Sequence, residues 1–320
     1  MKPTISLIVP CYNVQDHVQP ALQSILDNIS ATDHARLQVL IVNDGSTDQT
    51  LEKIEQFIAE KWYSTIRHHI ITQENAGLSA ARNAGMAQAT GDYWLFLDSD
   101  DIFINQALDK IIAAIGQHAP DIIEFDAVKF RNHHWENKGL YADYFPQTEN
   151  LPLAAHRLRA FEENRWYVWS RCYHKKLFEN QIFEYSKLFE DMMTVPYLYL
   201  AAQHIFRLPE NLIGYRQRDN SIVASLSHRH LRDIFYGVEK AMAAETRYPE
   251  FKTELTVLQY KNWRLIVAES IKRFLKTRDW AYLQDVQTYR AQMRHNFGRD
   301  YGWQFGYFGG VLMKKLLKKV

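Results

Sequence analysis

Three carboxylates lie within four residues at Asp98-Ser99-Asp100-Asp101, directly after the apolar run from Tyr93 to Leu97. Carboxylates this close repel one another unless a cation lies among them. Mg²⁺ and Mn²⁺ prefer oxygen ligands and are often shared between protein carboxylates and substrate phosphates. The sequence therefore predicts a divalent-metal site at this turn. The alternative is a solvated loop in which one aspartate caps the next helix.

A second acidic pair, Glu190-Asp191, precedes the apolar run from Met192 to Leu200. A carboxylate that takes a proton from an attacking hydroxyl must lie within hydrogen-bond reach of it. A carboxylate of this pair, Glu190 or Asp191, is therefore a candidate general base. The alternative is that both are acids in the first turn of a helix, where the helix dipole favours negative charge.

Two other segments carry groups that could hold a nucleotide. Asp44, in the turn Asn43-Asp44-Gly45-Ser46, could accept hydrogen bonds from a base or ribose, although an ordinary turn with a helix cap is the alternative. The segment from Glu74 to Asn83 opens a helix with small residues. The amides at its N-terminus could donate to an anion, and Arg82 adds a cation.

The second half of the chain offers basic and aromatic candidates. Arg216 and Arg218 alternate as in a strand, so they share a face and could reach phosphate oxygens. A surface strand with salt bridges is the alternative. Trp169 could stack on a sugar or fill the core. His228 and His230 could add a metal ligand, and the alternative is that these scattered histidines are surface residues.

These residues need elements that bring them together, and the first third of the chain alternates strand and helix patterns. Strands that alternate with helices pair in parallel with right-handed crossovers, and ligands bind beyond their carboxyl ends. The polar loops described above follow such strands, so we expect them to meet at one edge of the sheet. Strands are predicted at 5–9, 37–42, 66–71 and 93–97, and helices at 18–26, 51–58 (capped by Ser46 or Thr47) and 79–89.

The alternation loosens after about residue 120. A strand is predicted at 121–131, a polar and aromatic excursion at 133–150, and helices at 191–201 and from 229 to near 296. The predicted architecture is α/β, a Rossmann-like, mainly parallel sheet flanked by helices, with a helical C-terminal region. Its predicted parts are a catalytic domain at 1–222 (a nucleotide half at 1–101 and an acceptor half at 120–222), helices at 223–300 and a tail at 301–320.

Bulk composition is that of an ordinary globular protein. The net charge of +1 over 320 residues gives no field that would recruit nucleic acid. Two cysteines in a chain of this length indicate free thiols in the cytosol. No window holds the ~18 apolar residues that a spanning helix needs, so a soluble or peripheral cytoplasmic protein is expected.

Four motifs in this order make the chain resemble family 2 glycosyltransferases of the GT-A fold, the kind that builds bacterial surface polysaccharides such as capsule and lipopolysaccharide. The motifs are Pro10-Cys11-Tyr12-Asn13, Asn43-Asp44-Gly45-Ser46, Asn75 to Asn83, and Gly91-Asp92-Tyr93 leading into Leu97-Asp98-Ser99-Asp100-Asp101.

The resemblance implies an inverting transferase with a UDP-sugar donor, a glycan or lipid-linked glycan acceptor, and Mn²⁺ or Mg²⁺ that neutralises the leaving diphosphate. Asp191 would be the base, supported by Glu190. Asp100 would coordinate the metal, with Asp98 on its ribose side, and Trp169 would lie on the acceptor side. The implied nucleotide-sugar site comprises Pro10, Tyr12, Asn13, Asp44, Asn75, Arg82, Asp98, Ser99, Arg216, Arg218 and Ser221.

The chain ends in an amphipathic, basic pattern at 311–320, with apolar residues on one side of a helix and four lysines on the other. Such a helix is typical of peripheral contact with an anionic membrane, and docking on the protein itself or pairing in a homodimer are the alternatives.

Two other function classes fit parts of this pattern. A nucleotidyltransferase of related fold would need a Gly-rich, basic loop after the first strand, and Pro10-Cys11-Tyr12-Asn13 is neither. A non-catalytic nucleotide-binding or assembly subunit is the other alternative, against which the intact Asp98, Asp100 and Asp191 argue.

Overall fold

The computed structural model describes residues 3–62, 65–132, 134–141, 151–217 and 226–301. The chain separates into two compact units: one comprises residues 1–157 and 166–221, and the other residues 158–165 and 222–320. None of the helices within the described ranges has the length and apolar character needed to cross a bilayer.

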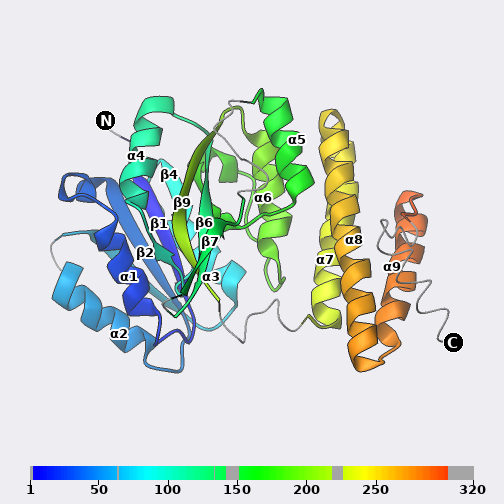
Figure 1. The fold of residues 1–320 in the computed structure, drawn as a ribbon, viewed down its shortest axis with the longest axis horizontal. Coiled ribbons are helices and arrows are strands. Elements are labelled where there is room, and N and C mark those ends of the chain that lie inside the picture. The colour runs from blue at the N-terminus through cyan, green and yellow to red at the C-terminus, as the bar shows by residue number, and fades with distance from the viewer. Residues whose placement is uncertain (1–2, 63–64, 133, 142–150, 218–225, 302–320) are drawn as a thin grey trace. The chain divides into compact units, whose positions relative to one another are not determined.

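The first unit is built on one mixed sheet, in which the described strands follow the order β3-β2-β1-β4-β8-β6-β9-β5, with β7 paired to β6 (Figure 1). Strands β3, β2, β1 and β4 are parallel, as predicted. Strand β8 runs antiparallel to both β4 and β6. The bounds are β1 Ile5–Cys11, β2 Leu37–Asp44, β3 Arg67–Gln73, β4 Tyr93–Phe96, β5 Ile102–Phe103, β6 Ile122–Arg131, β7 His134–Gly139, β8 Arg171–His174 and β9 Ile205–Arg216.

Helices cover both faces of the parallel strands, which explains why β1 is buried along its whole length. Leu7 belongs to the same core cluster as Leu22 of α1. Ile8, which points the other way, lies against Gly85 of α3, where a Cβ would be 2.6 Å from Ile8 Cγ2. The helices of this unit are α1 Val18–Asp27, α2 Thr50–Phe57, α3 Leu78–Gln88, α4 Ala107–His118 and α6 Glu190–Ala201, and α5 Leu153–Glu163 is divided between the two units.

Two local predictions were wrong. The cap of α2 is neither Ser46 nor Thr47: the N-cap is Gln49, and Asp48 Oδ1 accepts the amide of Thr50 at 2.9 Å. Part of the predicted excursion at 133–150 is the strand β7, which pairs antiparallel with β6 in a hairpin.

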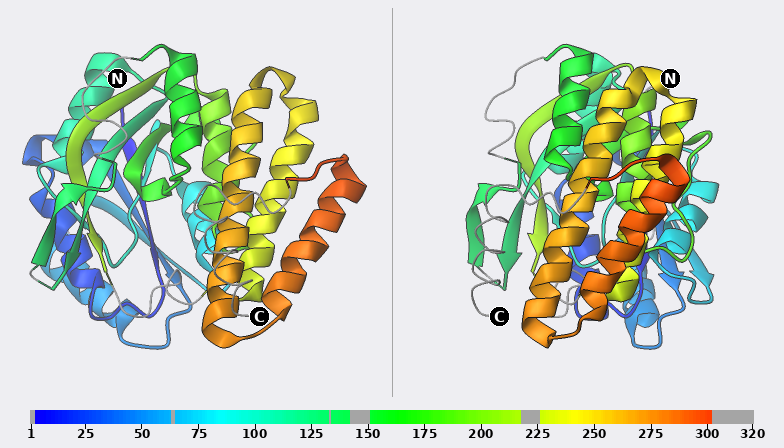
Figure 2. Two further views of the ribbon diagram at one scale, coloured as in Figure 1. Left: turned by 45° about the vertical axis from the view of Figure 1, so that its right-hand side comes forward. Right: turned by 90° about the vertical axis from the view of Figure 1, so that its right-hand side faces the viewer.

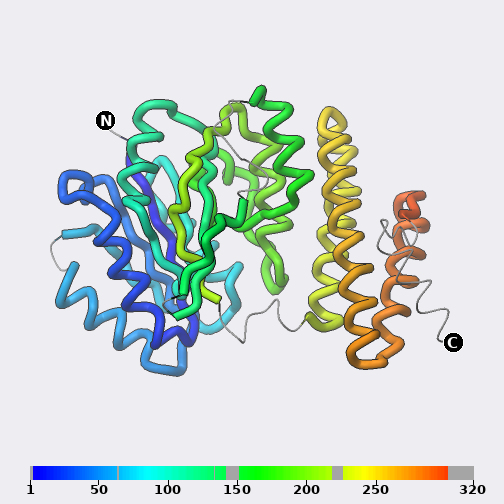
Figure 3. Tube along the Cα trace, in the orientation of Figure 1, coloured from blue at the N-terminus to red at the C-terminus, as the bar shows by residue number. Residues whose placement is uncertain are grey.

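The second unit contains three long helices that follow one another in the chain, α7 His228–Arg247, α8 Lys252–Thr277 and α9 Ala281–Phe297. Within this unit, α8 lies beside both α7 and α9 (Figures 2 and 3). A serine begins the first of them: Ser227 and His230 form reciprocal capping hydrogen bonds.

Candidate functional site

The acidic turn after β4 is tied to strand β9. The amide of Asp101 donates to the carbonyl of Asp98 at 2.9 Å, which closes the turn. Oδ1 of Asp101 accepts the backbone amide of Arg216 at 2.8 Å, and Arg216 Nε donates to the carbonyl of Asp100 at 2.7 Å. Arg216, predicted to bind phosphate, therefore braces the predicted metal turn.

Asp101 was given no role from sequence, yet it is the most deeply buried acid of the turn. It is 1% exposed, and its Oδ2 has no hydrogen-bond partner among the described residues. Burial, together with the charges of Asp100 and Asp98, raises the pKa of Asp101 well above its usual value. The turn therefore places three carboxyl groups close together, and among the described residues one buried oxygen of Asp101 has no hydrogen-bond partner.

A single arginine joins the turn to helix α6. Arg82, on α3, donates from Nη2 to Asp98 Oδ1 at 2.8 Å, and its Nη1 contacts Glu190 Oε1. The side chain is buried, and the nearby acids Asp98, Glu190 and Asp191 raise the pKa of Arg82 despite that burial. The guanidinium predicted to face an anion is thus engaged by two carboxylates of the protein itself.

Asp191, the predicted base, follows Glu190 in the first turn of α6. Its burial and the charge of Glu190 raise its pKa to about 7, although Arg82 acts in the opposite direction. Its Oδ1 accepts the amide of Met192 at 2.8 Å. A carboxyl that titrates near neutrality is suited to accept a proton and later release it.

The approach to α6 is held against α3 by a residue that sequence analysis left without a role. The Asn83 side chain donates to the carbonyl of Phe183 at 2.8 Å and accepts the amide of Phe183 at 3.0 Å. The two residues lie 100 positions apart, so no local spacing could have indicated this contact.

Asp44 fastens the loop that precedes α3. It is 2% exposed, and its carboxylate accepts hydrogen bonds from Gln73 Nε2 at 2.7 Å, the Ala76 amide at 3.0 Å and the Gly77 amide at 2.8 Å. Asn75 Nδ2 donates to the Asp44 carbonyl at 3.1 Å. The anion at this end of α3 is therefore Asp44 itself, and its contact with a nucleotide stays a prediction.

The loop after β1 is joined to the loop after β2. Asn13 Oδ1 accepts the amide of Thr47 at 2.8 Å, and the Asn13 amide donates to Ser46 Oγ at 3.2 Å. Tyr12, beside them, is 48% exposed, which leaves its ring accessible for stacking. Pro10 lies within β1 and is buried.

Cys11 and Ser99 connect the first strand to the acidic turn. Both are buried, and their side chains share a hydrogen bond. Burial raises the pKa of the Cys11 thiol to about 12, so the thiol is neutral. Cys11 and Cys172 are both free and buried, which confirms the expectation of free thiols.

Three aromatic rings pack together near the turn, on η3 (Val168–Ser170), the residue before it, and β9. Trp169 stacks on Tyr167 with centroids 5.0 Å apart and packs against Tyr215 at 5.1 Å. Trp169 is only 4% exposed, whereas Tyr167 and Tyr215 are half-buried. The accessible rings of this cluster therefore belong to the two tyrosines, and the buried Trp169 packs against both of them.

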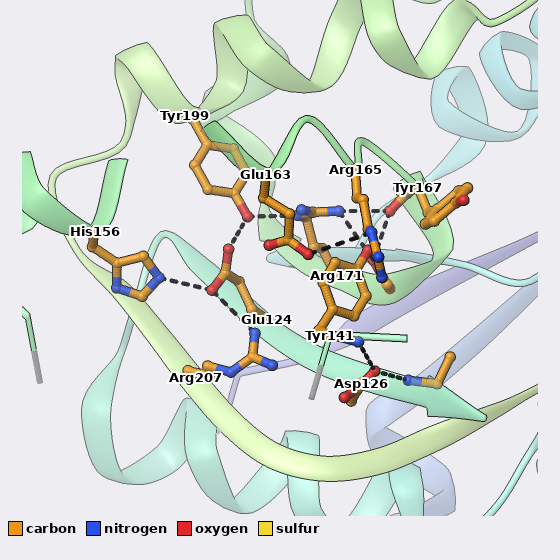
Figure 4. A network of polar contacts seen from close by, with 12 residues as sticks. Glu124, Asp126, Tyr141, His156, Glu163, Arg165, Tyr167, Arg171, Tyr199 and Arg207 are labelled. Carbon is orange, nitrogen blue, oxygen red and sulfur yellow. Dashed lines mark hydrogen bonds and ion pairs between the residues drawn. The ribbon is translucent and has the colours of Figure 1, made fainter. Parts of the chain in front are cut away.

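A buried polar network holds the segment that carries these rings (Figure 4). Glu124 on β6 accepts a hydrogen bond from Tyr199 and pairs with His156 at 2.7 Å. Arg171, which also contacts Tyr199, donates from Nη1 to the carbonyl of Tyr167 at 2.9 Å. The network thus fixes the backbone of the aromatic segment from behind.

Three predicted features lie outside the described residues: Arg218, Ser221 and the tail 311–320. Within the described ranges, no three His, Cys, Asp or Glu side chains gather as a metal site. His228 contacts Asp285 and Asp279 of its own helical unit, with the shorter distance 2.6 Å.

Comparison with known proteins adds a family and a fold. The model of the family described as "Glycosyl transferase family 2" matches residues 6–186. Glycosyltransferase GlyA of Streptococcus pneumoniae is 30% identical over 230 residues, which cover 68% of this chain and 31% of GlyA. The chain therefore spans about a third of the length of that relative.

Two solved structures share the fold. The crystal structure of S. aureus TarS 1–349 in complex with UDP-GlcNAc superposes with a TM-score of 0.63 at 19% identity, over 93% of each chain. A mannosyltransferase, PcManGT from Pyrobaculum calidifontis, in complex with GDP-Man and Mn²⁺, gives a TM-score of 0.55 at 16% identity, over 99% of this chain and 80% of PcManGT. At these identities the likeness establishes the architecture.

Proposed function

This chain belongs to glycosyl transferase family 2, and we propose that it moves a sugar from a UDP-sugar to a hydroxyl of a growing surface glycan, with inversion and with help from a divalent metal. The name of GlyA supports sugar transfer, and the UDP-GlcNAc bound by TarS supports the donor class. The acceptor would be a polysaccharide, a lipopolysaccharide or a lipid-linked oligosaccharide.

The observation that carries this proposal is the ion-pair bridge through Arg82. It joins Asp98, which begins the acidic turn, to Glu190, the neighbour of the candidate base Asp191. A donor diphosphate at the turn would then lie beside a carboxyl whose pKa is about 7. Proximity of a donor site and a base is what transfer to a hydroxyl requires.

In the proposed reaction, the Asp191 carboxylate takes the proton of the acceptor hydroxyl. The acceptor oxygen forms a bond to the anomeric carbon of the donor, while the bond from that carbon to the diphosphate oxygen breaks, and UDP leaves with the bonding electrons. Attack and departure on opposite faces invert the anomeric configuration. Glu190 keeps Arg82 in place and, through its charge, keeps the Asp191 pKa high.

The nucleotide would lie across the loops after β1 and β2. Tyr12 is accessible for stacking on the base, and Asn13 and Asn75 offer exposed side chains beside it. Asp44 shapes this pocket by holding Ala76 and Gly77, and it keeps lone pairs for a ligand donor.

The turn suits a divalent cation. Mg²⁺ and Mn²⁺ sites of this kind use one or two carboxylates and complete their coordination with substrate phosphates, so they do not require three protein ligands. Asp98 and Asp100 would hold the ion, and the buried Asp101, whose Oδ2 has no hydrogen-bond partner among the described residues, lies in the same turn. When bound, the metal would neutralise the leaving diphosphate.

Calorimetric titration with UDP and GDP, with and without Mn²⁺, tests this function on the purified protein. We expect binding of UDP that strengthens with Mn²⁺ and that Asp100→Ala abolishes, while the exposed Asp27→Ala, at the far end of α1, binds as the wild type does. Binding of neither nucleotide, or binding indifferent to Mn²⁺ and to Asp100, would count against the metal site and favour a non-catalytic subunit.

A further inference from the structure

A pocket of about 330 Å³ lies at the hairpin of β6 and β7, in a part of the chain to which the proposed mechanism gives no task. Its walls are aromatic and charged. Its lining includes Lys129, Phe130, Arg131, His134, Trp135 and Glu136.

The most unusual wall residue is Trp135. Its side chain is 44% exposed, yet its ring is held in place by a stack on Phe130, with centroids 4.6 Å apart and planes at 17°. Gly214 of β9 permits this position, because a Cβ there would lie 2.9 Å from Trp135 Cη2. An exposed indole held rigidly against a glycine offers a flat apolar surface, which suits the apolar face of a sugar ring.

The pocket lies on the same edge of the sheet as the acidic turn. Strand β8 is antiparallel to both β4 and β6, so β4 and β6 run in the same direction and end at one edge. Phe130 is in register with Arg216 of β9, and the Arg216 guanidinium lies 4.5 Å from the Phe130 ring. Arg216 in turn donates to the carbonyl of Asp100. The Arg216 side chain therefore contacts both Phe130, in the pocket lining, and the proposed donor turn.

The charges of the pocket are mainly positive. Lys129 and Arg131 line it together with His134, and Glu136 is the acid among the residues named above. Lys129 makes no ion pair with any described residue, so its ammonium is available to a ligand. A carboxylate or phosphate on a bound glycan would complement this set.

We propose that this pocket, which we call the hairpin pocket, binds the acceptor glycan: a sugar ring of the acceptor stacks on Trp135, and an anionic group of the same chain pairs with Lys129. The inference rests on the proposed glycosyltransferase function. It assigns acceptor recognition to the hairpin, in addition to the acceptor-side role that the family resemblance implies for Trp169.

The test is binding of the 320-residue chain, in the presence of UDP and Mn²⁺, to an array of bacterial surface-glycan fragments that bear uronic acids, phosphodiesters or no charge. We expect the wild type to prefer an anionic class. Trp135→Ala should weaken that binding by about tenfold, which corresponds to about 1.4 kcal/mol. Trp135→Phe should retain most of it, and Lys129→Gln should lower affinity for the anionic fragments and leave the neutral ones unchanged. The two charged classes separate a carboxylate ligand from a phosphate ligand.

Trp280→Ala is the matched control, because Trp280 is 65% exposed and lies in the helical unit. UDP affinity is measured on the wild type and on each variant, to separate this inference from the proposed function. If the wild type does not bind UDP, both the proposed function and the hairpin pocket are contradicted. Normal UDP binding with no glycan bound by the wild type, or with equal glycan binding by wild type and Trp135→Ala, overturns the hairpin pocket alone.

Discussion

Arg82 Nη2 lies 2.8 Å from Asp98 Oδ1, and this contact is half of a bridge whose other half reaches Glu190. The Arg82 side chain is 3% exposed, so the bridge is little screened by solvent. It fixes the spacing between the turn that would hold the donor and the helix that carries the candidate base. The bridge thereby holds α3, the acidic turn and the start of α6 together.

Replacement of Arg82 by Met should destabilise the first unit by about 3–5 kcal/mol, because two acids lose their buried counter-charge. Arg82→Lys should cost less and still lower turnover, since one ammonium cannot reproduce the two-sided contact. Urea unfolding measures the first effect. The control is Lys175→Met, which removes an exposed pair with Asp92 at 3.4 Å and should cost about 1 kcal/mol or less. Equal costs at the two positions would contradict a buried bridge.

Asp191→Asn should lower turnover by about 10²–10⁴-fold, the usual contribution of a general base, and leave UDP affinity unchanged. In the wild type, kcat/KM should rise with pH around the Asp191 pKa of about 7, because the ionised form accepts the proton. The exposed Glu179→Gln, outside the site, serves as control. A wild-type profile that is flat from pH 5 to pH 8 would remove Asp191 from the role of base.

The same raised pKa has the opposite consequence for stability. A carboxyl whose folded-state pKa exceeds its unfolded value of 3.8 favours folding less and less as pH rises from that value to about 7. Asp191→Asn should therefore gain in melting temperature relative to the wild type between pH 5 and pH 8. Differential scanning calorimetry at these two pH values measures the gain. If the melting-temperature difference between Asp191→Asn and the wild type is the same at pH 5 and pH 8, Asp191 ionises freely in the folded protein.

Glu124→Gln should destabilise the first unit at pH 7 by about 3–5 kcal/mol, because Arg171 and Arg207 lose their buried counter-charge (Figure 4). Although burial acts to raise it, the pKa of Glu124 is lowered to about 2 by His156 and the two arginines. The stabilisation is therefore complete above about pH 4.5 and is lost as pH falls toward 2. Urea unfolding from pH 7 to pH 3 measures this effect. The difference in free energy of unfolding between the wild type and Glu124→Gln should shrink as pH falls, with the exposed Glu52→Gln as control.

The order of strands and helices in the first third of the chain could be predicted because it depends on local patterns. The run from Ile5 to Val9 is apolar on both faces since helices cover both faces, and α3 is rich in small residues since it packs closely on β1. The convergence of the polar loops follows from the parallel strands that precede them.

Contacts between distant residues could not be predicted in this way. Nothing near Arg82 in sequence indicates Glu190, 108 positions away, and the bond between Asn83 and Phe183 has no periodic signature. The sequence predicts a ligand role for Trp169 and none for Trp135, because a sequence does not show that Trp169 is 4% exposed and Trp135 44% exposed. Strand β7 was missed because it is polar and exposed along most of its length.

Gly45→Ala should weaken UDP binding more than it weakens the fold. Gly45 has φ +66°, where an L-residue costs about 1–2 kcal/mol. An added Cβ would also lie 2.6 Å from the backbone nitrogen of Asn75, which must then move away. That movement would strain the hydrogen bonds from Ala76 and Gly77 to Asp44, and with them the loop proposed to face the nucleotide.

Gly298→Ala separates the two effects of Gly45→Ala, which are the conformational cost of a positive φ and the displacement of Asn75. Gly298 has φ +63° at the end of α9, but an added Cβ there meets nothing within 4 Å. It should show the conformational cost alone, with UDP affinity unchanged, whereas Gly45→Ala should lose at least about tenfold in affinity, or about 1.4 kcal/mol. Titration calorimetry and urea unfolding of both variants give the comparison. If Gly45→Ala binds UDP as Gly298→Ala does, the loop after β2 does not form the nucleotide site.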